Sequence, residues 1–133
     1  MKTNKLFYLL AILSFGMVIS SCGDDEEGNE ITITIEEPLD DETISDCGDV
    51  HIHVEITASD ENHEVEIVLH PEGNTEDKII DFDMHAHDQV ITFEQEVDLC
   101  SYPAGTCFHL EVLACTDHDC EETETEDVEF CLQ

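Results

Sequence analysis

The sequence predicts an all-β fold, an antiparallel β-sandwich of about seven strands braced by disulfides. Apolar and polar residues alternate along most of residues 30–133, as expected for strands with one buried face. Turn-forming residues separate these short segments, and no stretch shows a helical period over a useful length. Seven short alternating segments in a chain of this size are typical of two packed sheets.

The first two predicted strands show the clearest alternation. Residues 30–36 alternate three isoleucines with two threonines, and the acidic residues after Pro38 are expected to form a turn. Residues 49–57 place four branched aliphatic side chains on one face, which we expect to lie in the core. His51 and His53 take the opposite, outward face.

The remaining predicted strands follow with turns between them. Residues 63–70 form the third strand, which ends before Pro71. Residues 78–86 form the fourth, with Met84 inward and His85 outward. The fifth, sixth and seventh strands cover residues 89–99, 106–114 and 127–131.

The N-terminus has the organisation of an export signal. Lys2 and Lys5 give a positively charged start, which precedes an apolar stretch at residues 6–19. This stretch is shorter than the ~20 residues needed to span a membrane. The stretch leads into Ile-Ser-Ser-Cys, which resembles a lipobox. We therefore expect residues 1–21 to be a lipoprotein signal peptide and the Cys22 thiol to be acylated. The alternative is an ordinary signal peptide followed by a chance cysteine.

Residues 22–29 are expected to be the acylated cysteine and an acidic tether. The run Asp-Asp-Glu-Glu resembles the surface-export tether of Bacteroidetes-type lipoproteins. It implies an exported protein that is lipid-anchored to the outer membrane and displayed at the cell surface. The alternative is a solvated, flexible spacer, which leaves open the leaflet that carries the anchor.

The acidic composition limits the partners of this chain. Its formal net charge is −32 at pH 7, and outside the predicted signal peptide only Lys78 opposes thirty-five acidic residues. Such a surface repels nucleic-acid phosphates, so nucleic-acid binding is excluded. It also repels anionic lipid headgroups, so we expect the acyl anchor alone to attach the protein to the membrane. Suitable partners are cations, a basic protein or an outer-membrane receptor component. The alternative is that the charge only keeps the protein soluble.

Besides Cys22 the chain has six cysteines, an even number that predicts a disulfide framework in a small exported domain. Sequence alone leaves many connectivities open. A zinc site made of cysteines is the alternative, but no pair has the CxxC spacing of zinc ribbons. The spacing suggests the pairs Cys100–Cys107 around a turn, Cys115–Cys120 across a hairpin tip, and Cys47–Cys131 between distant strands.

One segment looks like the penultimate strand of Ig-like domains. It covers residues 103–112 with Ala114 and Asp117, and has Cys107 where an aromatic residue is usual. Most of residues 30–131 also resembles a family of small, histidine-bearing Ig-like lipoproteins of unknown function from Bacteroidetes. The resemblance implies an Ig-like fold and a lipoprotein address, without an activity. The matching pieces are residues 50–53 (VHIH), 67–70 (IVLH), 85–87 (HAH) and 108–110 (FHL).

Eight histidines in a chain with so few lysines favour a metal site. Four of them form two His-x-His pairs. Residues two apart on a strand point to the same face, so both imidazoles of a pair can reach one ion. Zinc and copper favour such nitrogen ligands. The alternative is that histidine simply fills outward polar positions.

The Ig layout groups these histidines into two candidate sites. The third and sixth strands are neighbours in one sheet, so His70 and His109 are expected side by side. The His-x-His pair of the fourth strand joins them if that strand attaches to the same sheet. The predicted zinc or copper ligands are therefore His70, His85, His87 and His109, with His51 and His53 as a second candidate pair on the opposite sheet.

Other functions have weaker support in the sequence. Acidic turns such as residues 60–62 and 117–119 offer oxygen ligands for calcium, but none has the EF-hand pattern. No serine lies in a nucleophile-elbow motif, and the cysteines are expected to form disulfides. We therefore expect that the protein is not an enzyme. The rival hypothesis is a non-catalytic adhesion or accessory module that binds a basic protein through its acidic face.

Overall fold

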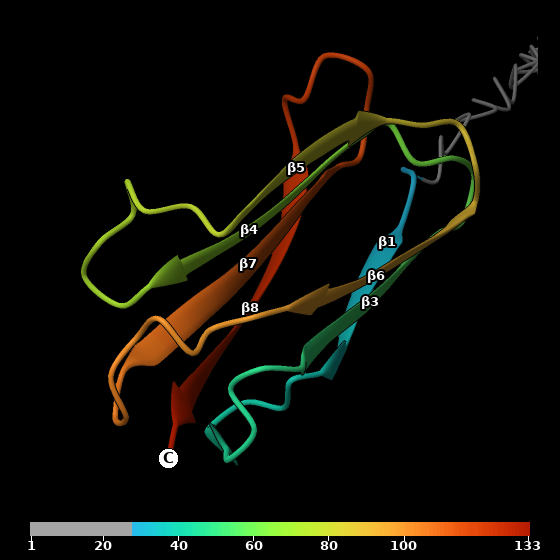
Figure 1. Cartoon of the computed structure of the whole chain (residues 1–133). Coiled ribbons are helices and arrows are strands. Elements are labelled where there is room, and N and C mark those ends of the chain that lie inside the picture. Colours follow the sequence, from blue (N-terminus) through green and yellow to red (C-terminus); the bar gives the residue numbers. More distant parts are fainter. Residues whose placement is uncertain (1–27) are drawn as a thin grey trace, which may run out of the picture.

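The computed structural model describes residues 28–133, which fold into two stacked β-sheets (Figure 1). The predicted signal peptide, Cys22 and most of the acidic tether lie outside these residues. Among residues 28–133 no helix is long and apolar enough to cross a membrane. The strands are β1 (Ile31–Glu37), β2 (Glu42–Ile44), β3 (Val50–Ala58), β4 (Glu64–Pro71), β5 (Ile80–His85), β6 (Val90–Val97), β7 (Cys107–Cys115) and β8 (Thr123–Leu132).

The predicted all-β sandwich is confirmed. One sheet has three strands in the order β1-β3-β6, and the other has five in the order β2-β8-β7-β4-β5. All strand pairs are antiparallel except β2 with β8, which are parallel. This layout places the third strand from the C-terminus, β6, with β1 and β3, and it places the C-terminal hairpin beside β4, as in Ig-like domains.

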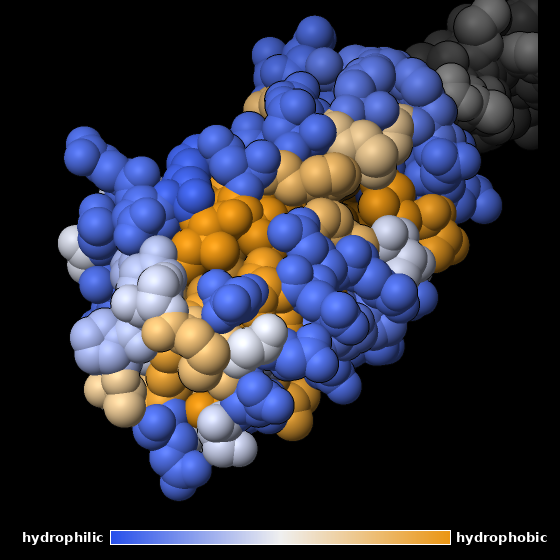
Figure 2. Space-filling model, in the orientation of Figure 1, coloured by the Kyte–Doolittle hydropathy of each residue, from blue (hydrophilic) through white to orange (hydrophobic). Residues whose placement is uncertain are grey.

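The core lies between the sheets and follows the alternation that the sequence shows. In β3 the four aliphatic residues expected inward are all buried, and His51 and His53 point outward. Full burial of one such side chain contributes about 1.5–3 kcal/mol. On the face drawn in Figure 2, an apolar band runs between the two sheets and hydrophilic residues cover the surface on either side. The partly buried residues packed against the core include Phe82, Met84 and Phe93.

Two strand assignments differ from the prediction. The segment expected to be only a turn contains β2, which follows Asp41 at φ 61°. The Asp41 N–H donates to the Glu129 carbonyl (2.8 Å), and the Glu129 N–H donates to the Asp40 carboxylate (3.1 Å). Three residues are too few to show a strand period. Strand β8 starts at Thr123 rather than at residue 127. The sequence did not show this start, because the first five residues of the strand are all exposed and carry no apolar signal.

The disulfides were only partly predicted. Cys115–Cys120 is confirmed, but Cys100–Cys107 and Cys47–Cys131 are wrong. The structure pairs Cys47 with Cys100 and Cys107 with Cys131. The chain passes from one sheet to the other between β6 and β7, so Cys100 and Cys107 belong to different sheets. Each bridges instead to the neighbour in its own sheet: Cys107 lies directly opposite Cys131, and Cys47 precedes β3 where Cys100 follows β6.

Candidate metal centre

Three loops at one end of the sandwich bring four possible metal ligands together. Glu61 and His63 lie between β3 and β4, His87 lies between β5 and β6, and His118 lies between β7 and β8. One ligand atom from each of these residues lies within 4.8 Å of every other. We call this group the loop cluster.

Buried polar contacts hold the first two loops of the cluster together. The fully buried Asn62 donates twice to the Asp88 carbonyl, from its backbone N–H (3.1 Å) and from its amide nitrogen (2.8 Å). The Ala86 N–H donates to the His63 carbonyl at 2.7 Å. These bonds fix the segment before β4 against the segment after β5, and His63 and His87 therefore approach each other.

The third loop is held by a disulfide and by turn chemistry. Cys115–Cys120 closes the loop that carries His118. The Asp117 carboxylate accepts hydrogen bonds from the N–H groups of Asp119 (3.0 Å) and Glu121 (3.1 Å). Aspartate favours such bonds to the backbone just after it, as in an Asx-turn. Asn29 ties this loop to the first, since its amide donates to the carbonyls of Glu61 and Thr116, at 2.6 and 3.2 Å.

The Glu61 carboxylate lies among three imidazoles. Its Oε2 is 3.2 Å from His87 Nδ1, and its Oε1 is 3.8 Å from His118 Nε2 and 4.0 Å from His63 Nδ1. The His63 and His118 rings have centroids 4.2 Å apart. One carboxylate therefore faces three nitrogen donors that converge from separate loops.

His63 is the least ordinary member of the loop cluster. It is 7% exposed, and its Nδ1 has no hydrogen-bond partner within residues 28–133. The side-chain oxygen of its neighbour Asn62 is likewise buried without a partner there. Leaving a buried polar group unsatisfied costs about 1–3 kcal/mol. A cation between His63 and Glu61 would remove this cost at the nitrogen.

The donor set suits a transition metal. Three imidazoles and one carboxylate match the four-coordinate nitrogen and oxygen sites of zinc, and imidazole is also a good copper ligand. His85 is a further imidazole at the margin of the loop cluster, with its ring centroid 4.8 Å from that of His87 and 6.1 Å from that of His118.

The structure divides the predicted four-histidine site into two pairs. His70 lies directly opposite His109, with ring centroids 5.8 Å apart, as expected. His85 and His87 also lie together, but His85 is opposite Glu64 at the start of β4. His70 lies six positions after Glu64 on β4, so the two pairs lie about 20 Å apart along the sheet. The fourth predicted strand does attach to this sheet, but its antiparallel direction carries its histidines to the far end.

Sequence reasoning missed Glu61, His63 and His118 as members of one site. The sequence predicts acidic turns with calcium-type oxygen ligands at residues 60–62 and 117–119, and it predicts His63 as the first residue of a strand. The usable signal was positional, because all three flank strand ends that an Ig-like layout brings to the same end of the molecule.

The second predicted pair, His51 and His53, lies on the outer face of the three-stranded sheet as expected. Their ring centroids are 6.0 Å apart, and each ring has its own carboxylate: His51 Nδ1 is 2.9 Å from Glu37, and His53 Nδ1 is 2.9 Å from Glu36. The hydrogen bond to Glu37 raises the pKa of His51. Desolvation opposes this effect, and the charges of Glu37, Glu94 and Glu96 add to it.

Comparison with known proteins assigns no family. No protein-family model and no curated protein matches the chain. Among solved structures, the β-glucosidase from Listeria innocua in complex with glucose is similar with a TM-score of 0.36 and 12% identity, over 77% of this chain and 16% of that chain. A similarity this low supports no inference about function.

Proposed function

We propose that this protein binds a transition-metal ion, zinc or copper, through Glu61, His63, His87 and His118. The observation that carries the proposal is the buried Nδ1 of His63, which lacks a partner in the described part of the chain and faces the Glu61 carboxylate. One ligand atom from each of the other two imidazoles lies within 4.8 Å of those of Glu61 and His63. A metal ion satisfies all of these groups at once.

The arrangement differs from histidines that only fill surface positions. A filler histidine is exposed and finds water, whereas His63 is buried and its loop is fixed by the Asn62 bonds to Asp88. Ordering three loops around converging polar groups costs conformational entropy. The free energy of binding an ion would offset this cost, which ordinary surface residues do not do.

The proposed setting is a membrane-anchored, surface-exposed lipoprotein without catalytic activity. The signal-like N-terminus and Cys22 support the anchor, and the high negative charge supports cation capture, since it raises the local concentration of cations near the surface. In this role the acidic domain collects metal ions outside the cell, and the lipid keeps it at the membrane.

Calorimetric titration of the metal-stripped chain with zinc and with copper tests the proposal. The His87→Ala/His118→Ala variant removes two ligands from positions that are exposed, so the core stays intact. We expect binding to weaken by more than about tenfold. The matched control is His51→Ala/His53→Ala, which removes the same number of imidazoles on the opposite sheet. Equal binding by the two variants, or no binding below millimolar concentration by the unmodified chain, overturns the proposal.

The acidic surface favours a second candidate function, a non-catalytic adhesion or accessory module that meets a basic protein. One lysine among the described residues leaves the carboxylates of the outer strands almost wholly without cationic neighbours. This function predicts association that weakens with salt and is indifferent to chelators. Pull-down of a basic partner with and without chelator separates it from metal binding.

A further inference from the structure

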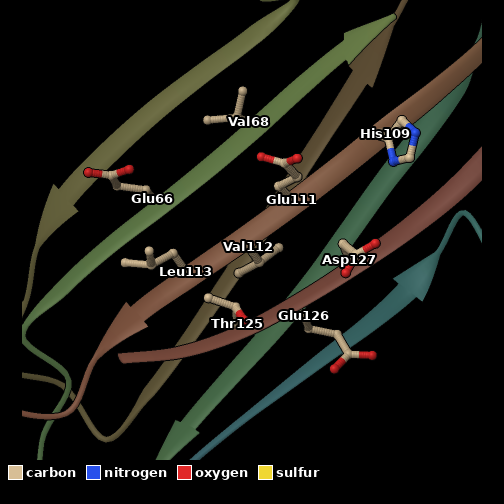
Figure 3. Close-up of a pocket in the computed structure, with 9 residues that line it drawn as sticks. All are labelled: Glu66, Val68, His109, Glu111, Val112, Leu113, Thr125, Glu126 and Asp127. Atoms are coloured by element: carbon tan, nitrogen blue, oxygen red, sulfur yellow. The ribbon is translucent and has the colours of Figure 1, made fainter. Parts of the chain in front are cut away.

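An open groove of about 460 Å³ lies on the outer face of the five-stranded sheet, across β4, β7 and β8. Figure 3 shows Glu66 and Val68 on β4, Glu111 and Leu113 on β7, and Asp127 on β8 around it. Its volume falls within the range of about 300–1,000 Å³ that is typical of ligand pockets. No residue of the loop cluster lines this groove, so the two sites are separate. We call it the outer groove.

Two half-buried aliphatic side chains form the apolar part of the outer groove. Val68 lies directly opposite Glu111, and Leu113 lies two residues further along β7, so Val68 and Leu113 are diagonal neighbours on the outward face. Outward positions of an antiparallel sheet that faces water are ordinarily polar. An apolar pair at these positions offers a contact surface that the packing of the core does not use.

Carboxylates flank this apolar pair in two rows that cross the sheet. One row contains Glu66 and, directly opposite it on β5, Asp83. The other row contains Glu111 and, directly opposite it on β8, Asp127. Like charges in directly opposite positions destabilise a sheet. A cationic group placed between the two members of a row would relieve this repulsion.

Two carboxylates of the outer groove lack a cationic partner. Glu66 and Asp127 are exposed and take part in no ion pair within residues 28–133, whereas Glu111 lies 3.5 Å from His70 Nε2. Lys78 is the one lysine in that range, which contains no arginine, and its Nζ is paired with a different carboxylate at 2.8 Å. The described part of the chain therefore leaves these two groups to a cation from outside.

The spacing of the carboxylates favours an extended chain over a single ion. Among the described residues, no carboxylate that lines the groove belongs to a group close enough to share one metal ion. The two rows cross β7 at Glu111 and Leu113, two residues or about 7 Å apart, and alternate side chains of an extended peptide have the same spacing. Lysine and arginine also bring aliphatic stems, which can cover an apolar surface while their charged heads reach carboxylates.

We infer that the outer groove docks an extended segment of a basic protein with lysine or arginine at alternate positions. The inference rests on the second candidate function, a module that meets a basic partner, and it assigns the contact to one face. The two cations lie at the rows of Glu66 and Glu111, and their stems pack on Val68 and Leu113. A second copy of this chain is a poor occupant, because its net charge of −32 opposes self-association.

Fluorescence anisotropy of a labelled peptide tests the inference on the metal-stripped chain, with chelator present. The probe is Gly-Ser-Arg-Ser-Arg-Ser-Gly, whose arginines alternate. The comparison peptide, Arg-Gly-Ser-Ser-Ser-Gly-Arg, has the same composition and charge with its arginines far apart. We expect the probe to bind in one saturable step that weakens with salt, and the comparison peptide to bind at least about threefold more weakly.

The variant Glu66→Gln/Asp127→Asn removes one carboxylate from each row at exposed positions. We expect it to bind the probe about fivefold more weakly, as for the loss of two exposed ion pairs. The matched control is Glu94→Gln/Glu96→Gln, which removes two exposed carboxylates from β6 on the opposite sheet. At physiological ionic strength these distant charges are screened, so the control should change the affinity by less than about twofold.

A second variant tests the apolar contact without changing the charge. Val68→Thr/Leu113→Thr keeps residues that favour strands and lies on the outward face, so the core is untouched. We expect it to bind the probe about threefold more weakly, because the arginine stems lose their apolar surface. Unchanged affinity in this variant overturns the assignment of the segment to the outer groove. Circular dichroism shows whether each variant is folded, and Glu66→Gln alone carries the comparison if a double variant is not.

Three further results overturn the inference. Equal losses in the two charge variants, or equal binding of the two peptides, indicate diffuse attraction to the acidic surface. Tighter binding of putrescine, a diamine with the same charge as the probe, assigns the groove to a small amine. No binding by either peptide also overturns the inference, and the pull-down of a basic partner decides separately whether the second candidate function falls with it. The metal proposal is unaffected by all of these results.

Discussion

His63 Nδ1 lies 4.0 Å from Glu61 Oε1, too far for a hydrogen bond, in a place where His63 is almost fully buried. The nitrogen is left without a partner in residues 28–133 at the point where three loops meet. Because burial of a polar atom is tolerated only when something satisfies it, this relationship links the stability of the fold to the occupancy of the site.

Replacement of His63 by leucine should have opposite effects with and without metal. In the metal-free chain the substitution removes an unsatisfied buried group, so the free energy of unfolding should stay the same or rise by about 1 kcal/mol. With zinc present the same variant should lose the stabilisation that the ion gives. Urea unfolding with and without chelator measures both effects. Strong destabilisation of the metal-free variant would show that His63 already has a partner.

Zinc should raise the stability of the unmodified chain by mass action. At a free concentration one hundred times the dissociation constant, we expect about 2.7 kcal/mol of added unfolding free energy. At the same zinc concentration the effect should fall to about 1.4 kcal/mol or less in His118→Gln, because a tenfold or greater loss of affinity leaves zinc at no more than ten times its dissociation constant. The His118 side chain is exposed, so its loss disturbs no core packing. His53→Gln is the control and should keep the shift. Thermal unfolding followed by circular dichroism over a zinc series is the measurement, and an identical shift in both variants contradicts the assignment.

The Cys115–Cys120 bridge should matter for metal affinity more than for stability. It closes a loop with a sequence separation of 5, so its removal should cost about 2 kcal/mol, less than the about 4 kcal/mol expected for Cys47–Cys100 with a separation of 53. His118 lies inside the short loop, so Cys115→Ala/Cys120→Ala should weaken zinc binding. Cys47→Ala/Cys100→Ala should leave zinc affinity unchanged at a temperature where it is folded. Calorimetry measures the zinc affinity of both variants. Weaker zinc binding by Cys47→Ala/Cys100→Ala than by Cys115→Ala/Cys120→Ala would refute the prediction.

His51 should titrate above its ordinary range because of Glu37. The hydrogen bond to Glu37 raises the pKa of His51 in the folded state. The interaction therefore contributes its full stabilisation at pH values below 6.5, the pKa of His51 in the unfolded chain. That stabilisation is lost as the pH rises through the higher folded value. In Glu37→Gln the pKa of His51 should fall toward 6.5. NMR titration of the imidazole protons is the measurement, and an unchanged pKa of His51 in the variant contradicts the assigned cause.

The buried face of most strands could be predicted from the sequence, while the location of the candidate metal ligands could not. Period-2 alternation identifies inward residues such as Ile52 and Leu110 without knowledge of the partners. It also placed His70 beside His109, because these positions follow from strand order. It could not show that β5 runs antiparallel to β4 and so carries His85 away from His70, because direction and register depend on long-range pairing.

Residues in loops were the least predictable. Glu61 and His118 belong to segments without periodicity. Long-range hydrogen bonds, such as that from Asn29 to the Glu61 carbonyl, and the Cys115–Cys120 disulfide determine where they lie. The same holds for the cystines, since Cys107 is separated from Cys131 by a whole hairpin and meets it only through the β7–β8 register. For Cys100 and Cys107, the local spacing favoured a pairing that the crossing between the two sheets separates.

The residues of the loop cluster are spread from residue 61 to residue 118, so the cluster spans more than half of residues 28–133. A partly folded chain emerging amino end first can offer Glu61, His63 and His87, but it lacks the fourth ligand until the last hairpin has closed. For the metal binding proposed above, we therefore expect ion capture to be a late event in maturation, with an immature chain competing poorly for metal. Only molecules that have completed their architecture would take ions away from their surroundings.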